Sequence, residues 1–127
     1  MTTADAEGLK PLVWIGSSLK DLREFPPDVK RDMGSALLLA QKGSKAEGVK
    51  PLQGFGGASV LEVVEDHRGD TFRAVYTVRF VTVVYVLHAF QKKSKRGKET
   101  PKADMDTIRR RLALAEARHK EFLRETT

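Results

Sequence analysis

The sequence predicts an α+β fold, and two patterns within its 127 residues carry that prediction. Three segments between residues 60 and 90 are rich in β-branched and aromatic residues, which is typical of an antiparallel meander. The segments before and after them repeat apolar residues at helical spacing. We therefore expect an antiparallel sheet with an N-terminal strand, a helical hairpin packed on one of its faces, and a long C-terminal helix.

Length and composition indicate a single domain. A chain with 40% hydrophobic and 31% charged residues is ordinary for a globular protein with one core. We expect residues 1–10 to form a flexible leader and residues 11–125 to form the domain. The absence of cysteine excludes disulfides and thiolate metal sites. We find no secretion signal and no apolar run of membrane length, so we expect a cytoplasmic protein without a membrane partner.

The N-terminal elements follow from short apolar runs and helix signals. Residues 12–15 form an apolar run before Gly16 and predict the first strand. Ser17 or Ser18 would cap a short helix, with Asp21 completing a capping box after Ser18. The Pro26–Pro27 pair ends that helix and begins a second one, which we expect to run to Gly43. The apolar face of this second helix consists of Val29, Met33, Ala36, Leu37 and Ala40.

The sheet and the last helix are predicted from alternation and caps. We expect strands over residues 60–65, 72–80 and 81–90, with a turn at residues 67–70. In the second strand, alternation places the side chains of every second residue from Phe72 to Phe80 on one face. Thr100 as cap and Pro101 at the first position begin the terminal helix. Its apolar stripe consists of Met105, Ile108, Leu112, Ala115 and Phe122.

A net charge of +6 favours a polyanionic or acidic partner. The densest positive segment directly follows the last predicted strand and contains Lys92, Lys93, Lys95, Arg96 and Lys98. Clustered cations of this kind neutralise nucleic-acid phosphates. A solvated loop that keeps the edge of the sheet soluble would have the same composition, so both interpretations stay open.

Two further side chains are candidates for chemistry. Arg73 lies on the strand face opposite Phe72 and Ala74, where its guanidinium suits a phosphate. The alternative is an ion pair with Glu62 or Glu65 on the neighbouring strand. His88 lies near the end of the last strand, on the same predicted face as Val86 and Phe90, and suits proton transfer. The alternative is a histidine that is merely hydrogen-bonded. We expect neither a metal site nor a cofactor.

Several motifs in order resemble the RelE/ParE toxin superfamily. These are Val-Lys-Pro-Leu-Gln-Gly at residues 49–54, Val-Leu-Glu-Val at 60–63 and Phe-Arg-Ala-Val-Tyr at 72–76. The run Leu-His-Ala-Phe-Gln-Lys-Lys-Ser at 87–94, followed by Thr100–Pro101 and a helix, looks like the phage-derived HigB-type branch. The resemblance covers about residues 11–120 and implies a RelE-like fold.

The resemblance implies a toxin of a type II toxin–antitoxin pair that cleaves mRNA on the ribosome. Such a metal-independent endoribonuclease uses the RNA 2′-hydroxyl as its nucleophile. Arg73 would stabilise the transition state, and Lys92 and His88 would complete the catalytic set. The nearby Lys93, Lys95, Arg96 and Lys98 would bind RNA. The implied partners are the ribosome, mRNA and an antitoxin with a helix-turn-helix domain. Operator DNA would be bound only through this antitoxin.

The sequence departs from the family on the first strand of the meander. RelE-like toxins tend to carry basic residues there, whereas this chain has Glu62 and Val64. The general base is therefore not assigned. A ParE-like inhibitor of DNA gyrase without nuclease activity is the alternative, and an inactive RNA-binding remnant is a third.

Overall fold

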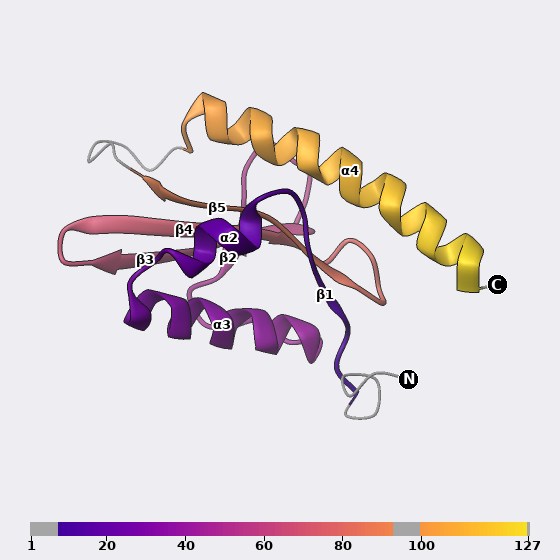
Figure 1. Cartoon of the computed structure of the whole chain (residues 1–127), viewed down its shortest axis with the longest axis horizontal. Helices are drawn as coiled ribbons and strands as arrows, with labels where there is room; N and C mark the ends of the chain where they lie inside the picture. The colour runs from indigo at the N-terminus through magenta and orange to yellow at the C-terminus, as the bar shows by residue number, and fades with distance from the viewer. Residues whose placement is uncertain (1–7, 93–99, 127) are drawn as a thin grey trace.

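The computed structural model describes residues 8–92 and 100–126, which form one sheet with helices on both faces (Figure 1). In order across the sheet, the strands are β1 (Leu12–Trp14), β5 (Val84–Lys92), β4 (Asp70–Thr77), β3 (Val60–His67) and β2 (Lys50–Pro51). Strands β2 to β5 pair antiparallel, and β1 pairs parallel to β5. The α+β class, the antiparallel meander and the addition of the N-terminal strand to it are confirmed.

A short helix α2 (Ser18–Arg23) and a longer helix α3 (Pro27–Gln41) form the predicted hairpin on one face of the sheet (Figure 1). All five apolar residues predicted for α3 are buried. They pack against alternate residues of the strands, including Leu61, Val63, Phe72, Ala74 and Tyr76. The predicted capping box is wrong, because Ser18 is fully buried and its hydroxyl donates to the Val86 carbonyl. The Ser17 hydroxyl donates instead to the Asp21 carboxylate at 2.7 Å.

The long helix α4 (Lys102–Thr126) covers the opposite face of the sheet and extends beyond it towards the C-terminus (Figure 1). It begins just after Pro101, whose carbonyl accepts from the Met105 amide. Four of the five predicted stripe residues pack into a second core, whereas Phe122 is 39% exposed. The sheet side of this core includes Val60, Val75, Tyr85, Leu87 and Phe90.

Two predictions about the β4–β5 region are wrong. The predicted strand over residues 72–80 ends at Thr77, and β5 begins at Val84. The Thr77 hydroxyl donates to the Ser59 carbonyl and accepts from the Arg79 amide, which turns the chain out of the ladder. Phe80 consequently packs beneath α4 against Tyr85 and not on the face of Phe72.

A β-bulge in β5 changes the face on which its later residues lie. Val75 pairs with His88 whereas the next residue, Tyr76, pairs with Val86, so Leu87 is an extra residue in the ladder. The extra residue interrupts the alternation of side chains. Val86 packs towards the helical hairpin, and His88 faces α4 together with Phe90. The prediction that His88 shares a face with Val86 is therefore wrong, and its sharing a face with Phe90 is confirmed.

Candidate active site beneath helix α4

The three predicted catalytic residues lie on the α4 side of the sheet. Arg73 is on β4, and His88 and Lys92 are on β5. The register pairs Arg73 with Phe90, which lies between His88 and Lys92 on that face, so tertiary structure brings the three together. They are 6%, 8% and 7% exposed, respectively. The four predicted RNA-binding residues Lys93, Lys95, Arg96 and Lys98 lie outside the described residues.

Arg73 is held by an acidic neighbour. Its Nη1 donates to Glu62 Oε2 at 3.2 Å and to Thr100 Oγ1 at 3.3 Å. This is one of the two ion pairs weighed from the sequence. The other ion pair does not form. Glu65 lies three residues after Glu62, so the alternation of side chains along β3 places it on the opposite face of the sheet from Arg73. Burial, Asp32 and Asp66 raise the pKa of Glu65.

Glu62 belongs to the site as well, although the sequence named it only as a partner of Arg73. Its side chain is 8% exposed, and it lines a cavity of about 400 Å³ between β2 and the start of α4. The cavity is also lined by Lys50, Pro51, Leu52, Gln53, Thr100 and Met105. The Glu62 carboxylate therefore contacts Arg73 and also borders a space large enough for part of a nucleotide. Alternation along β3 would have placed Glu62 on this face, but nothing in the sequence marks the cavity.

His88 is clamped between two side chains of α4. Its Nε2 lies 2.7 Å from Asp104 Oδ1, and its Nδ1 lies 3.3 Å from Arg111 Nη1. The imidazole also stacks on the Phe90 ring at a centroid distance of 4.7 Å. In the structure, His88 is therefore a hydrogen-bonded histidine, which was the alternative weighed from the sequence. Phe90 is 9% exposed and part of the core, as the sequence favoured.

Sequence reasoning missed Asp104 and Arg111. Arg111 Nη1 also donates to the Leu87 carbonyl at 3.1 Å, and its Nη2 donates to Ser17 Oγ at 3.1 Å. Burial lowers the pKa of Arg111, an effect that Asp21 opposes. A signal was present, since Asp104 and Arg111 recur with Ile108 and Ala115 at the spacing of one helix face. Charged residues at such positions face the sheet.

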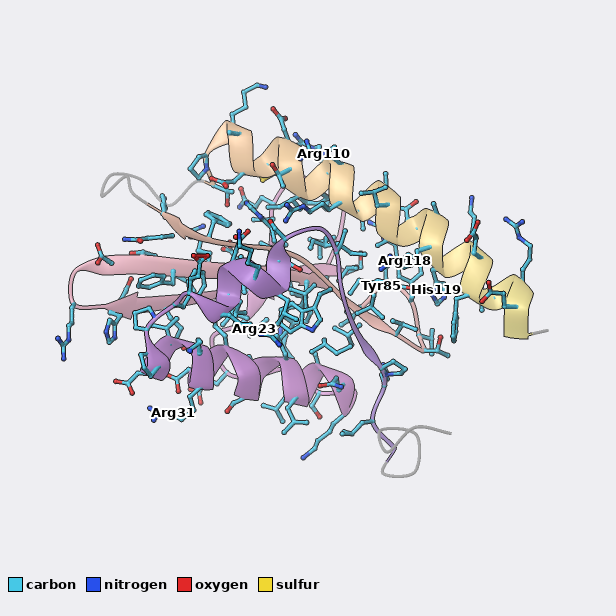
Figure 2. The ribbon with its side chains drawn as sticks, viewed as in Figure 1. Arg23, Arg31, Tyr85, Arg110, Arg118 and His119 are labelled. Carbon is cyan, nitrogen blue, oxygen red and sulfur yellow. The ribbon has the colours of Figure 1, made fainter. Side chains whose placement is uncertain are left out.

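The other histidines lie apart from this site. His119 Nδ1 is 3.1 Å from the Tyr85 hydroxyl, under the C-terminal half of α4 (Figure 2). His67 makes an edge contact with Phe72 on the hairpin side. Within residues 8–92 and 100–126, no cluster of three or more potential ligands has the geometry for a metal ion. In the same ranges, no helix is both long and apolar enough to span a membrane.

Residues 20–113 match the family of phage-derived Gp49-like proteins (DUF891). That segment includes most of α2, all of α3, β2 to β5 and the first half of α4. It therefore contains Glu62, Arg73, His88, Lys92, Asp104 and Arg111. The chain belongs to the Gp49-like family. A search of curated protein sequences finds no match.

Two solved structures of RelE toxins confirm the RelE-like fold. This Gp49-like chain is similar to the isolated RelE toxin of E. coli, with 19% identity, a TM-score of 0.51, and coverage of 80% of this chain and 97% of the other. A free mutant RelE toxin of E. coli matches with 20% identity and a TM-score of 0.50, over 64% and 81% of the two chains. A RelBE toxin–antitoxin complex from Mycobacterium tuberculosis matches with 18% identity and a TM-score of 0.44, over 68% and 94%.

Proposed function

We propose that this Gp49-like protein is the toxin of a type II toxin–antitoxin pair and cleaves mRNA on the ribosome. The observation that carries the proposal is the gathering of Glu62, Arg73 and His88 on one face of the sheet. A carboxylate, a guanidinium and an imidazole are the groups that general acid–base cleavage of RNA needs. The RelE-like fold and the net charge of +6 support the same function.

Each group has a role in transesterification. Glu62 accepts the proton of the RNA 2′-hydroxyl while the 2′-oxygen forms a bond to phosphorus. Arg73 stabilises the negative charge that develops on the phosphoryl oxygens. The bond from phosphorus to the 5′-oxygen then breaks. The Nε2–H of His88 donates a hydrogen bond to that oxygen while the oxygen takes up a proton from solvent, and Glu62 returns its proton to solvent. The products are a 2′,3′-cyclic phosphate and a free 5′-hydroxyl. Lys92, at the end of β5, contributes positive charge to RNA binding.

The cavity beside Glu62 is the route by which RNA reaches this set. Thr100, just before α4, and Met105, in its first turn, border the cavity, and Asp104 contacts His88 from that same turn. Asp104 is 26% exposed at its side chain, so it is the more accessible partner of the imidazole. RNA that enters here displaces Asp104 from Nε2 and takes its place.

The partners follow from the proposed activity. The ribosome supplies mRNA, and an antitoxin neutralises the toxin in the cytoplasm. We expect the antitoxin to carry a helix-turn-helix domain that binds operator DNA, while the toxin does not contact the operator itself. The basic residues Lys93, Lys95, Arg96 and Lys98 remain the predicted RNA-binding set.

The test is mapping of new mRNA 5′-ends after brief induction of the parent, Glu62→Gln and Arg73→Lys. New ends within translated codons are expected for the parent and are expected to fall about 100-fold for each variant, because one of the groups that act on the transferred phosphate or proton is lost. Arg79→Lys is the matched control. Arg79 pairs with Glu116, which lies on α4 well beyond Asp104, the residue that contacts His88. It should cleave as the parent does.

Two results would contradict the assignment. Full cleavage by Glu62→Gln and Arg73→Lys would remove both residues from the chemistry. Growth arrest by the parent without new mRNA ends would exclude the nuclease. The closed ion pair between Arg73 and Glu62 also fits a toxin that needs no acid and base. Arrest with DNA damage signalling would accordingly favour ParE-like inhibition of gyrase.

A further inference from the structure

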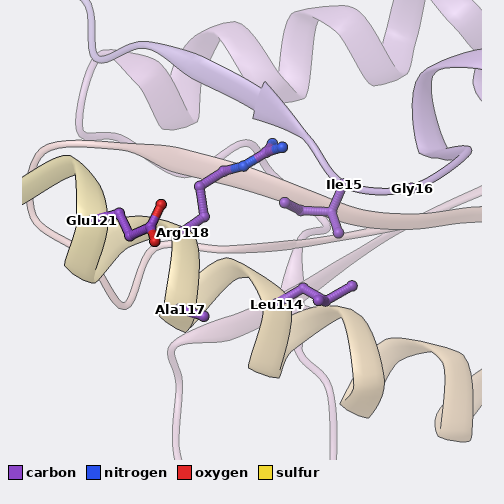
Figure 3. Close-up of a pocket in the computed structure, with 6 residues that line it drawn as sticks. All are labelled: Ile15, Gly16, Leu114, Ala117, Arg118 and Glu121. Atoms are coloured by element: carbon purple, nitrogen blue, oxygen red, sulfur yellow. The ribbon is translucent and has the colours of Figure 1, made fainter.

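The guanidinium of Arg111 is held by two separate segments, the turn before α2 and strand β5. The guanidinium donates to Ser17 before α2, to the Leu87 carbonyl in β5, and to His88 Nδ1. Gly16 leaves the space that the guanidinium occupies, because a Cβ at that position would lie 2.7 Å from Arg111 Nε. Figure 3 shows Ile15 and Gly16 in the turn after β1, opposite Leu114 of α4. A glycine is needed there for space and for its φ of +58°.

The two contacts of His88 are compatible with one tautomer of the neutral ring. An ionised carboxylate only accepts hydrogen bonds, so Asp104 requires a proton on Nε2. A guanidinium only donates, so Arg111 requires an unprotonated Nδ1. A neutral imidazole with its proton on Nε2 satisfies both neighbours, whereas the opposite tautomer satisfies neither.

The backbone contact ties this tautomer to the β-bulge. Leu87 is the extra residue that turns His88 towards α4, and its carbonyl is the one that Arg111 binds. A single side chain thus holds both the bulge and the ring that the bulge presents. Stacking on the Phe90 ring further limits rotation of the imidazole.

We propose that Arg111 is a positioning residue that holds His88 in its Nε2-protonated form and aims that N–H edge at the start of α4. The tautomer is a property of the free protein. Its consequence for RNA cleavage rests on the proposed function, in which Nε2 meets the 5′-oxygen. Arg111 itself does not touch the substrate, because it lies behind the imidazole at Nδ1 and contacts the Leu87 carbonyl there.

Long-range proton–nitrogen correlation spectra of the 15N-labelled full chain at slightly alkaline pH test the proposal. Loss of the signals in His88→Gln assigns the ring among the three histidines. The parent should show a protonated Nε2 and an unprotonated Nδ1. In Arg111→Met the Nδ1-protonated tautomer should rise to a comparable population, because Nδ1 has lost its donor. A parent with mixed tautomers, or an Arg111→Met ring unchanged from the parent, would overturn the proposal.

Two further variants keep the test decisive. Gly16→Ala should displace the guanidinium without removing its charge, and should shift the tautomer in the same direction as Arg111→Met. This variant decides the outcome if Arg111→Met does not fold. Arg110→Met is the matched control, since it removes the same charge from the adjacent, exposed position of α4 (Figure 2). Its His88 spectrum should equal that of the parent.

Cleavage kinetics separate this inference from the proposed function. Arg111→Met should lower the first-order rate of cleavage at saturating ribosomes by up to about 100-fold, because the donor edge is misaligned. The ribosome concentration at half-maximal rate should stay the same. A parent that cleaves no RNA would contradict the proposed function and leave the tautomer result standing. A changed tautomer with an unchanged rate would contradict the positioning role alone.

Discussion

Single buried polar groups determine much of the chemistry and stability of this Gp49-like protein. Arg73 and Glu62 are both more than nine-tenths buried at their side chains, and each compensates the charge of the other. Removing one partner of such a pair leaves an uncompensated buried charge, which is the costly change. For this reason the proposed tests use Arg73→Lys, which keeps the charge, and Glu62→Gln, which removes the charge but keeps the volume and an oxygen that can accept from Arg73.

The hydroxyl of Tyr76 is a buried polar group that the fold leaves unsatisfied. Tyr76 is fully buried in the core beneath α3, and its hydroxyl has no hydrogen-bond partner within the described part of the chain. We expect Tyr76→Phe to raise the free energy of unfolding by about 1 kcal/mol, because the desolvation cost of the hydroxyl is removed. Urea unfolding measures the change. A loss of stability in this variant would contradict the unsatisfied hydroxyl.

The burial of Tyr76 also makes the free energy of unfolding depend on pH in the alkaline range. Burial raises the pKa of Tyr76 to about 12, from an ordinary value near 10. The unfolded chain therefore releases this proton first, and the stability of the parent should fall as the pH rises from about 10 to about 12. Tyr76→Phe should lose less stability over this range. The residual fall belongs in part to Tyr85, whose pKa burial also raises.

At the scale of elements, the two faces of the sheet are covered by different means. The hairpin α2–α3 presents small and medium apolar residues to β3 and β4, as its helical spacing predicts. Helix α4 combines an apolar stripe with two charged residues that contact β5, Asp104 and Arg111. A third, Glu116, pairs with Arg79 in the connection between β4 and β5. The docking of α4 is thus partly apolar and partly polar.

Two leucines of α4 provide a matched test of which face is docked. Leu112 is 7% exposed and Leu114 is 54% exposed. Leu112→Ala should lower the free energy of unfolding by about 2 to 4 kcal/mol, since it leaves a cavity in the second core. Leu114→Ala should change it by less than about 0.5 kcal/mol. Urea unfolding of both variants decides the matter, and equal effects would contradict the packing of α4 described above.

At the scale of the whole molecule, the sheet separates two apolar cores and the net charge is +6. If the chain binds RNA as proposed, its affinity for ribosomes contains a contribution from released counterions. Raising the salt concentration from about 50 to about 200 mM should weaken co-sedimentation with ribosomes by at least about 10-fold. Binding that is independent of salt would contradict an electrostatic contact with RNA.

The sequence by itself determined the α+β class, the order of the elements apart from the short strand β2, the hairpin, the terminal helix and the apolar faces of α3 and α4. These features depend on local periodicity and caps, which are properties of short segments. It also placed Arg73 on the correct face of its strand and named Glu62 as one of two partners, because alternation holds along β3 and β4.

Tertiary structure alone decided how these segments meet. The bulge at Leu87 moves His88 to the face opposite that of Val86, and no residue type announces an extra residue in an apolar strand. The bonds of Thr77 end β4 three residues early, and the side chain that positions His88 lies 23 residues further along the chain. Contacts between distant segments depend on register and docking, which a local pattern does not contain.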